Sequence, residues 1–274
     1  MTACGGADGM TRSVLDEAPP AASRAPRLVD VRMPEASGTA VYSDEGVTLD
    51  ASNASEGYVM VKSGESDMRR KARIEKDEGA YNYDQRDDGA YETYPLQMGD
   101  GDYGVQVLEQ VEGTMYTRIF KKDLKVELSS EFAPYLYPNQ FVSYTQSDAA
   151  VTLSGQLAAG MTDEKEIADS LFRYVADEIR YDYDKAATVA TGYLPVPDET
   201  LETGKGICFD YSALLATMLR AQGIPAKLVI GHVAPDDLYH AWNMAYVGGE
   251  WKFYDATLDG EGRKEADYTG EREY

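Results

Sequence analysis

Residues 204–215 read Gly-Lys-Gly-Ile-Cys-Phe-Asp-Tyr-Ser-Ala-Leu-Leu, and this stretch decides how the chain folds. A glycine-flanked loop leads into a helical pattern, with Cys208 at the junction. A thiol at a helix start meets unpaired backbone N–H groups and the positive end of the helix dipole, and both favour the nucleophilic thiolate. A cysteine on a helix is more often a small buried apolar residue. The choice between these two roles depends on what accompanies Cys208.

Regular elements surround the cysteine. The helix that follows it has an apolar face and ends at Gly223, and an earlier helix is expected from Thr162–Lys165 to about Arg180. Three strands are expected downstream, at residues 224–231, 239–247 and 250–256. The C-terminal half is therefore predicted to be an α+β unit in which the cysteine helix packs on an antiparallel sheet.

The last two strands meet at Gly248-Gly249, and this joint allows a geometric test. A two-residue hairpin would pair Val247 with Glu250, which puts His240 and Asp255 on one face of the sheet as diagonal neighbours. Such neighbours lie roughly 7–8 Å apart at the backbone, within reach of long side chains. A loop of odd length would move Asp255 to the opposite face. The sequence permits a histidine–carboxylate contact without fixing it.

The N-terminal half has a different texture. Short alternating segments are expected to be strands at residues 57–62, 71–76, 104–109, 116–120 and 124–128. With turn clusters between them, they predict a β-sandwich-like domain over residues 39–128. Neither His nor Cys occurs in it. A connector follows at residues 129–150, rich in Pro and aromatic residues, and the catalytic core is expected at 151–274.

Composition limits the classes of partner. The chain has 274 residues, 43% of them hydrophobic, which is enough for two modest domains with real cores. Its formal net charge is −22. That charge argues against nucleic acid and against electrostatic docking to an anionic membrane. Solubility is the simplest explanation of the charge, and a preference for basic or amine-bearing partners is the alternative.

Cys4 is one of only two cysteines, so there is no disulfide framework. Residues 1–6 read Met-Thr-Ala-Cys-Gly-Gly, which is similar to the end of a bacterial lipoprotein signal, although the charged and apolar regions that should precede it are missing. Residues 1–38 are interpreted as a flexible leader and possible lipoprotein tether, with Cys4 as the candidate lipidation site. The alternative is an accidental cysteine in a disordered terminus.

Several motifs together resemble the core of the transglutaminase-like superfamily. They are residues 206–211 around the cysteine, 223–226, His240-Ala241-Trp242, Trp251, and Asp255-Ala256-Thr257. The match spans about Ile167 to Leu258, and the flanking segments resemble secreted bacterial members with an N-terminal β domain. The resemblance implies a papain-like α+β fold in which a helix carries the nucleophile and adjacent strands carry His and Asp. The family usually has Pro after the aspartate, where this chain has Ala256.

The resemblance also implies roles. Cys208 would attack a carboxamide or peptide carbonyl, His240 would hold the thiolate and protonate the leaving amine, and Asp255 would orient His240. The Cys208 N–H is a candidate oxyanion donor, and Tyr193 is a candidate side-chain donor. Trp242 and Tyr211 are candidates for the cleft wall.

These roles lead to an expected function. It is cysteine-dependent acyl transfer, or amide or peptide hydrolysis, on extracellular protein or peptide substrates. No cofactor and no metal ligand set is expected. A membrane would be reached only through a lipid anchor, on the surface of a bacterial cell. The substrate and the choice between an amine and water as acceptor stay open.

Three alternatives remain. His232 is the only other histidine, and it lies closer to the cysteine in sequence. Asp210 is interpreted as a residue that stabilises the helix N-terminus with its side chain turned away from the thiolate, because a nearby negative charge would oppose that thiolate. The whole protein could also be a surface-anchored binding or scaffolding module that kept the fold and lost turnover.

Overall fold

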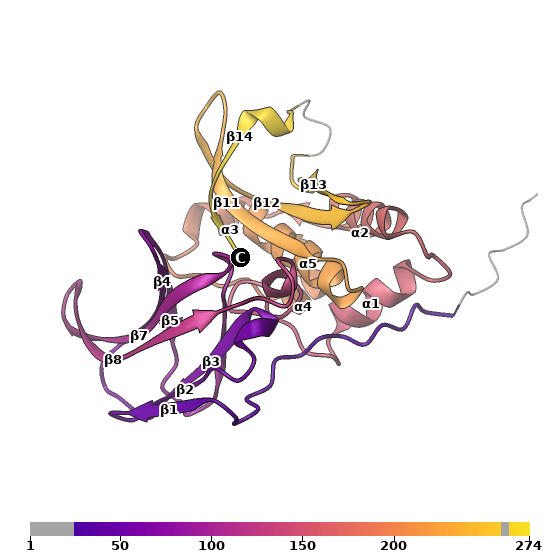
Figure 1. The fold of residues 1–274 in the computed structure, drawn as a ribbon. Coiled ribbons are helices and arrows are strands. Elements are labelled where there is room, and N and C mark those ends of the chain that lie inside the picture. The colour runs from indigo at the N-terminus through magenta and orange to yellow at the C-terminus, as the bar shows by residue number, and fades with distance from the viewer. Residues whose placement is uncertain (1–24, 259–262) are drawn as a thin grey trace, which may run out of the picture.

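The computed structural model describes residues 25–258 and 263–274. Its strands and helices form an N-terminal β region and a C-terminal region in which helices pack on a sheet (Figure 1). The α+β class predicted from the sequence is confirmed, with a β region of two sheets placed before the region of helices and sheet.

The N-terminal region consists of two four-stranded antiparallel sheets, in the orders β1-β2-β3-β6 and β5-β4-β7-β8. Within β4, Arg70, Ala72 and Ile74 are buried and alternate with more exposed residues, as expected for a strand with one face on a core. The sheets consist of β1 (Val41–Asp44), β2 (Val47–Asp50), β3 (Tyr58–Ser63), β4 (Arg70–Lys76), β5 (Gly79–Gln85), β6 (Glu92–Pro95), β7 (Gly101–Glu112) and β8 (Met115–Val126).

One strand differs from the sequence prediction. The two segments expected at 116–120 and 124–128 are a single twelve-residue strand, β8. The polar residues between them, such as Lys121 and Asp123, stay paired with β7 and point into solvent. The pairing with β7 is regular through residues 121–123, and the register shifts lie opposite residues 115–120, so the charged run 121–123 only resembled a break between two strands.

The C-terminal region is centred on α5, which packs against β11 and β12 and is flanked by α1, α2 and α4. The sheet has the order β13-β12-β11-β14. Its elements are α1 (Ala149–Leu157), α2 (Glu164–Glu178), β9 (Arg180–Tyr181), α3 (Tyr183–Thr188), α4 (Pro197–Thr203), β10 (Lys205–Gly206), α5 (Cys208–Ala221), β11 (Ala226–Val233), β12 (Leu238–Val247), β13 (Glu250–Tyr254) and β14 (Tyr268–Glu273).

Local sequence explains where the two main helices begin and end. Asp163 caps α2 by accepting a hydrogen bond from the Glu166 N–H at 2.9 Å. In α5, every residue from Asp210 to Ala221 is buried, so this is the central helix of the region. Gly223 follows α5 with a φ of 76°, a left-handed conformation that glycine adopts without a steric penalty.

Strand β14 was not expected from the sequence, and it sits unusually close to β11. A Cβ atom on Gly231 of β11 would lie 2.0 Å from the Thr269 carbonyl oxygen. Only glycine therefore allows the two backbones to approach this closely. The consequence is that Tyr268, the first residue of β14, is brought beside the centre of the sheet, paired with Val233.

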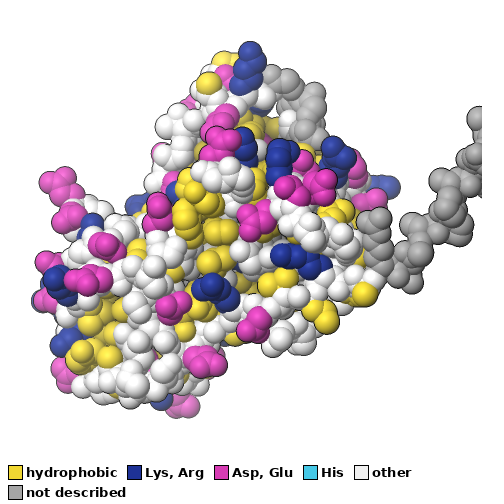
Figure 2. All heavy atoms as spheres, turned by 45° about the vertical axis from the view of Figure 1, so that its right-hand side comes forward, with side chains coloured by type: hydrophobic (Ala, Val, Ile, Leu, Met, Phe, Trp, Pro, Cys, Tyr) yellow, Lys and Arg dark blue, Asp and Glu magenta, His cyan; other side chains and the backbone are white. Residues whose placement is uncertain are grey.

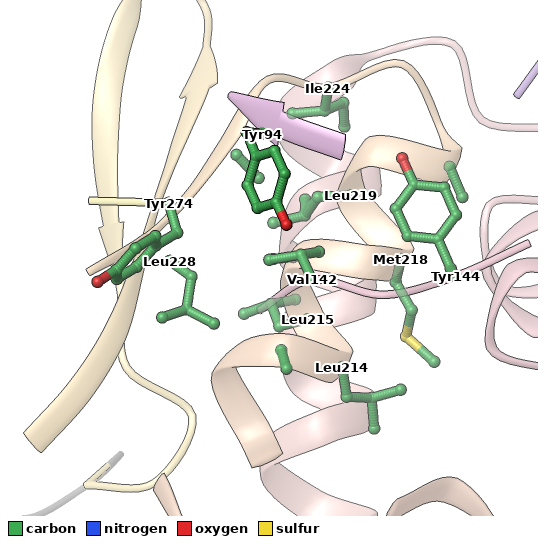
Figure 3. Packing of buried hydrophobic residues seen from close by; sticks show 14 of the residues in the cluster. Tyr94, Val142, Tyr144, Leu214, Leu215, Met218, Leu219, Ile224, Leu228 and Tyr274 are labelled. Carbon is green, nitrogen blue, oxygen red and sulfur yellow. The ribbon is translucent and has the colours of Figure 1, made fainter. Parts of the chain in front are cut away.

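The β region and the helical region share buried contacts. Tyr94 of β6 and Val142 of the connector lie over Leu215 and Leu219 of α5 (Figure 3). Near the C-terminus, the ring of Tyr274 packs 4.0 Å from Phe141, measured between ring centroids. The domain boundaries at 38, 128 and 150 stay a prediction, and one continuous apolar cluster crosses two of them.

The described end of the predicted leader also makes contacts. Arg27 donates to the Gln222 carbonyl oxygen at 2.9 Å, and its N–H donates to the Gly155 carbonyl oxygen at 2.8 Å. The Glu35 N–H donates to the Tyr58 hydroxyl. These contacts, which the sequence interpretation did not include, attach residues 27 to 35 to α1, to the end of α5 and to β3.

The surface carries charge of both signs. On the face shown in Figure 2, acidic side chains are spread over the whole molecule rather than gathered in one patch. This distribution fits the interpretation of the −22 charge as a solubility property. Among the helices of the described residues, none combines the length and the apolar character that crossing a membrane requires.

Candidate active site

The only cysteine among the described residues is the first residue of α5. The thiol of Cys208 is free and partly exposed, and it lines a cavity of about 470 Å³. Its backbone N–H belongs to the first turn of the helix, where N–H groups have no partner inside the helix. The sequence prediction that Cys208 lies at a loop–helix junction is therefore met by the structure.

His240 and Asp255 meet across the β12–β13 hairpin. Val247 pairs with Glu250, as a two-residue loop requires, and the ladder continues to Asn243 and Tyr254. This register leaves His240 and Asp255 on one face, with His240 Nε2 2.8 Å from Asp255 Oδ2. Both side chains are almost completely buried. The contact that the sequence permitted is formed.

The surroundings of His240 favour its protonated form. Burial opposes the charge of the imidazolium, but hydrogen bonds to Asp255 and to Cys208 outweigh burial and raise the pKa of His240 from 6.5 to about 9. Burial also opposes the charge of Asp255, but His240, Tyr268 and the Thr257 N–H lower the pKa of its carboxyl. With Nε2 bound to Asp255, the other ring nitrogen, Nδ1, is the one left for the thiol.

Replacing Asp255 with asparagine is expected to lower the pKa of His240 from about 9, because Asp255 is the largest of the groups that counter the burial of the ring. The folded-state pKa lies above 6.5, so protonated His240 stabilises the native fold fully below about 6.5. That contribution is lost as the pH rises through about 9. NMR titration of the His240 imidazole in the wild-type and Asp255→Asn proteins measures the change in its pKa. An unshifted midpoint in the variant would contradict this account of the pair.

Tyr193 lines the Cys208 cavity, but its hydroxyl has other partners. It donates to Asp210 Oδ1 at 2.6 Å and accepts from Lys185 Nζ at 2.6 Å. The single proton of this hydroxyl is thus directed at a carboxylate. To act as the predicted oxyanion donor, Tyr193 would have to release Asp210.

Asp210 lies in a buried network, away from solvent. One oxygen accepts from the Ile207 N–H at 2.8 Å, which satisfies a donor at the start of α5. The same oxygen lies 2.7 Å from Lys185 Nζ. The Lys185 charge balances the carboxylate, and the network fastens α3 and the loop at 189–194 to the helix that carries Cys208.

The two candidates for the cleft wall lie behind the cavity. Trp242 is buried and stacks beside the His240 ring, with centroids 6.4 Å apart and an interplanar angle of 17°. Tyr211 is buried and donates its hydroxyl proton to the Ile179 carbonyl oxygen at 2.6 Å. Neither is among the residues that line the Cys208 cavity. Trp242 supports the histidine, and Tyr211 anchors α5 to the end of α2.

His232, the alternative base, lies elsewhere. Its Nδ1 is 3.0 Å from Asp237 Oδ1 and its Nε2 is 3.6 Å from Glu271 Oε1, on the rim of a separate hollow. The residues that line the Cys208 cavity include His240 and not His232. The geometry therefore favours His240 as the partner of the thiol.

Sequence reasoning missed several residues of the site. Tyr181 and Tyr239 line the cavity. Burial raises the pKa of Tyr181 most, and the charge of Cys208 comes second. Burial and Glu271 raise the pKa of Tyr239 more than Cys208 does, but Cys208 also contributes. Tyr268 donates to Asp255 Oδ2 at 2.7 Å. Tyr181 belonged to a quoted motif, but no pattern in the sequence places Tyr268, which comes thirteen residues after Asp255.

Two further expectations concern metals and lipidation. Within residues 25–258 and 263–274, no three or more His, Cys, Asp or Glu side chains are grouped so that they could hold a metal ion. Cys4, the candidate lipidation site, lies outside the described residues.

The part of the chain that carries this site is similar to known proteins. The model of the transglutaminase-like superfamily matches residues 151–256, which include all three residues of the Cys–His–Asp set. UPF0252 protein MJ1282 of Methanocaldococcus jannaschii is 29% identical over 97 residues, covering 34% of this chain and 27% of that protein. The uncharacterized protein ML0607 of Mycobacterium leprae is 26% identical over 132 residues, covering 44% and 45%. The chain thus spans less than half the length of these curated relatives.

Two of the solved structures to which the chain is similar share little sequence identity with it. A protein of Cytophaga hutchinsonii, described as a candidate cysteine protease, is 15% identical, with a TM-score of 0.45 over 79% of this chain and 83% of that one. The periplasmic domain of TgpA from Pseudomonas aeruginosa is 16% identical, with a TM-score of 0.35 over 71% and 91%. Both TM-scores are below 0.5, so the family assignment rests on the sequence motifs and the family model. Residues 151–256 are therefore a transglutaminase-like domain.

Proposed function

We propose that this protein catalyses cysteine-dependent acyl transfer, or amide or peptide hydrolysis, on extracellular protein or peptide substrates. The observation that carries the proposal is the convergence of three groups. Cys208 and His240 line one cavity, and His240 is hydrogen-bonded to a buried carboxylate, Asp255, at 2.8 Å. A nucleophile, a base and a residue that orients the base are the groups that thiol acyl transfer requires.

The reaction has two halves. The Cys208 thiolate attacks the carbonyl carbon, and the C–N bond breaks as imidazolium His240 gives its proton to the leaving amine. A thioester of Cys208 remains. Neutral His240 then takes a proton from water or from an acceptor amine as that nucleophile attacks the thioester carbonyl, the C–S bond breaks, and the Cys208 thiolate is restored beside imidazolium His240. The Cys208 N–H, at the start of α5, is placed to stabilise the oxyanion. Asp255 keeps His240 oriented in both halves.

The turn after Asp255 bears on whether the site is active. Ala256 stands where members of the family usually have Pro. The carboxylate is nevertheless held, because Asp255 Oδ1 accepts from the Thr257 N–H at 2.9 Å and the Leu258 N–H at 3.2 Å. This anchoring favours the enzyme over the alternative, a binding module that has lost turnover.

The cavity beside Cys208 suits a peptide with an apolar side chain near the reacting carbonyl. Its lining includes Ala186, residues 189–193, Ile230 and Tyr239. Lys185, whose ammonium group donates to the Tyr193 hydroxyl, is engaged by Asp210. Pockets lined in this way bind mainly through apolar contact, with a few polar groups that fix orientation.

The location of the protein is part of the proposal. The similarity of residues 1–6 to a lipoprotein processing site supports a bacterial cell-surface protein anchored through Cys4. We propose protein or peptide as the partner and exclude nucleic acid on the strength of the net charge of −22.

Mass spectrometry of a complex peptide mixture, incubated with the protein and a labelled primary amine, tests the function. Label incorporation at glutamine side chains would identify transglutamination, and new peptide termini or deamidated glutamines would identify hydrolysis. A mixture unchanged by the protein, in conditions where Cys208 reacts with iodoacetamide, would contradict the enzyme and favour the binding module.

A further inference from the structure

Asp255 is a fully saturated carboxylate, and one of its two side-chain donors comes from outside the Cys–His–Asp set. Its Oδ1 accepts from two backbone N–H groups in the following turn. Its Oδ2 accepts from His240 Nε2 at 2.8 Å and from the Tyr268 hydroxyl at 2.7 Å. The two donors on Oδ2 fix the direction from which His240 is held.

We propose that Tyr268 is a positioning residue that acts through Asp255, fixing the carboxylate so that the His240 ring faces Cys208. The inference rests on the proposed function for its effect on turnover. Its structural basis is independent of that function, because the hydrogen bond is formed by groups that β14 brings to the site.

The Tyr268 ring is itself held in place. It packs edge-on against Phe253 and Trp242, at centroid distances of 4.7 and 5.1 Å, and it lies 6.2 Å from the His240 ring. The close approach of β14 at Gly231 sets the position of its backbone. A ring fixed on several sides can orient its hydroxyl with little further loss of conformational freedom, so the donor is preorganised.

The charged and titratable groups around this hydroxyl explain its effect on His240. Cys208 on α5 and Asp255 after β13 both favour protonated His240, while Arg263 and Asp267, in the segment before β14, act on Tyr268 with opposite sign. Burial and the hydrogen bond to Asp255 raise the pKa of Tyr268, so the hydroxyl stays protonated and donates. Its proton shares the carboxylate charge that would otherwise act on His240 alone.

Tyr268→Phe removes this hydroxyl and keeps the ring. We expect kcat to fall about 10- to 100-fold with KM unchanged, by analogy with the loss of a partner that orients a metal-binding side chain. The hydroxyl does not line the Cys208 cavity, so substrate contact is spared. NMR titration should show the pKa of His240 moving upward, since Asp255 would then interact with the imidazolium more strongly.

Tyr135→Phe is the matched control. The Tyr135 hydroxyl also donates to a residue of β14, the strand that holds Tyr268, but this residue is Glu273, which lies away from the site; the distance is 3.2 Å. It should leave kcat and the His240 titration as in wild type. In an Asp255→Asn background, Tyr268→Phe should have little further effect on the rate at which iodoacetamide alkylates Cys208, since the hydroxyl acts through that carboxylate.

Three outcomes are distinguishable. A Tyr268→Phe variant that matches wild type in kcat and in the His240 titration would overturn the proposal. The proposal would also be overturned if Tyr268→Phe changed the alkylation rate of Cys208 by the same factor in the wild-type and the Asp255→Asn backgrounds. The hydroxyl would then act by another route. A wild-type protein without turnover contradicts the proposed function only, and the titration and alkylation experiments still decide the role of Tyr268.

Discussion

Cys208→Ala is expected to abolish acyl transfer and hydrolysis, with kcat reduced by a factor on the order of 10⁵ to 10⁶, the loss found when a serine protease loses its nucleophile. No other thiol lies among the described residues, and the remaining groups of the cavity cannot form a thioester. Turnover of any substrate found in the peptide mixture measures the loss. The fold should be retained, because the thiol is partly exposed and its removal opens no closed cavity in the core.

Cys4→Ala is the matched control, since it removes the other cysteine of the chain. It should leave kcat unchanged in the soluble protein. If Cys208→Ala retains wild-type turnover while its circular dichroism is unchanged, Cys208 is not the nucleophile and the enzyme assignment fails.

Arg220→Met is expected to give the largest loss of stability, about 3–5 kcal/mol in the free energy of unfolding. The Arg220 side chain is almost fully buried, and burial lowers its pKa to about 10, so it remains charged at neutral pH. It donates to the carbonyl oxygens of Ala226, Tyr137 and Tyr274 at 2.7–3.0 Å. Methionine would relieve the buried charge, but the carbonyl groups would lose donors that the apolar surroundings cannot replace.

Urea unfolding of the Arg220→Met and Arg118→Met proteins measures the difference. Arg118 is exposed on β8, so its replacement should change stability by no more than about 0.5 kcal/mol. A similar small change at Arg220 would show that the hydrogen bonds from α5 to the connector, to β11 and to Tyr274 contribute little net free energy.

The elements around the nucleophile could be predicted because local signals there agree. The loop–helix junction at Cys208, the helix stop at Gly223 and the two-residue loop at Gly248-Gly249 each need only neighbouring residues. The loop length determines the register, and the register determines which face His240 and Asp255 share. This single short-range observation permitted, without fixing, the contact that the structure forms at 2.8 Å.

What escaped prediction depends on contacts between distant parts of the chain. Strand β14 contains Thr269, Glu271 and Arg272 without an apolar alternation, and it forms because Gly231 admits its backbone. Tyr193 seemed available as an oxyanion donor because its network with Lys185 and Asp210 joins three separate segments. Helices α3 and α4 are short, and helices of six and seven residues carry little periodic signal.

The rate at which iodoacetamide alkylates Cys208, followed from pH 4 to pH 10 in a Cys4→Ala background, reports whether Cys208 and His240 form a thiolate–imidazolium pair. Such a pair predicts rapid alkylation well below pH 7. His232→Ala should keep this behaviour. His240→Ala should lose the rapid alkylation below pH 7, because the imidazolium that holds the thiolate is gone. Slow alkylation of the wild-type protein below pH 7, or its loss in His232→Ala instead of His240→Ala, would contradict the account.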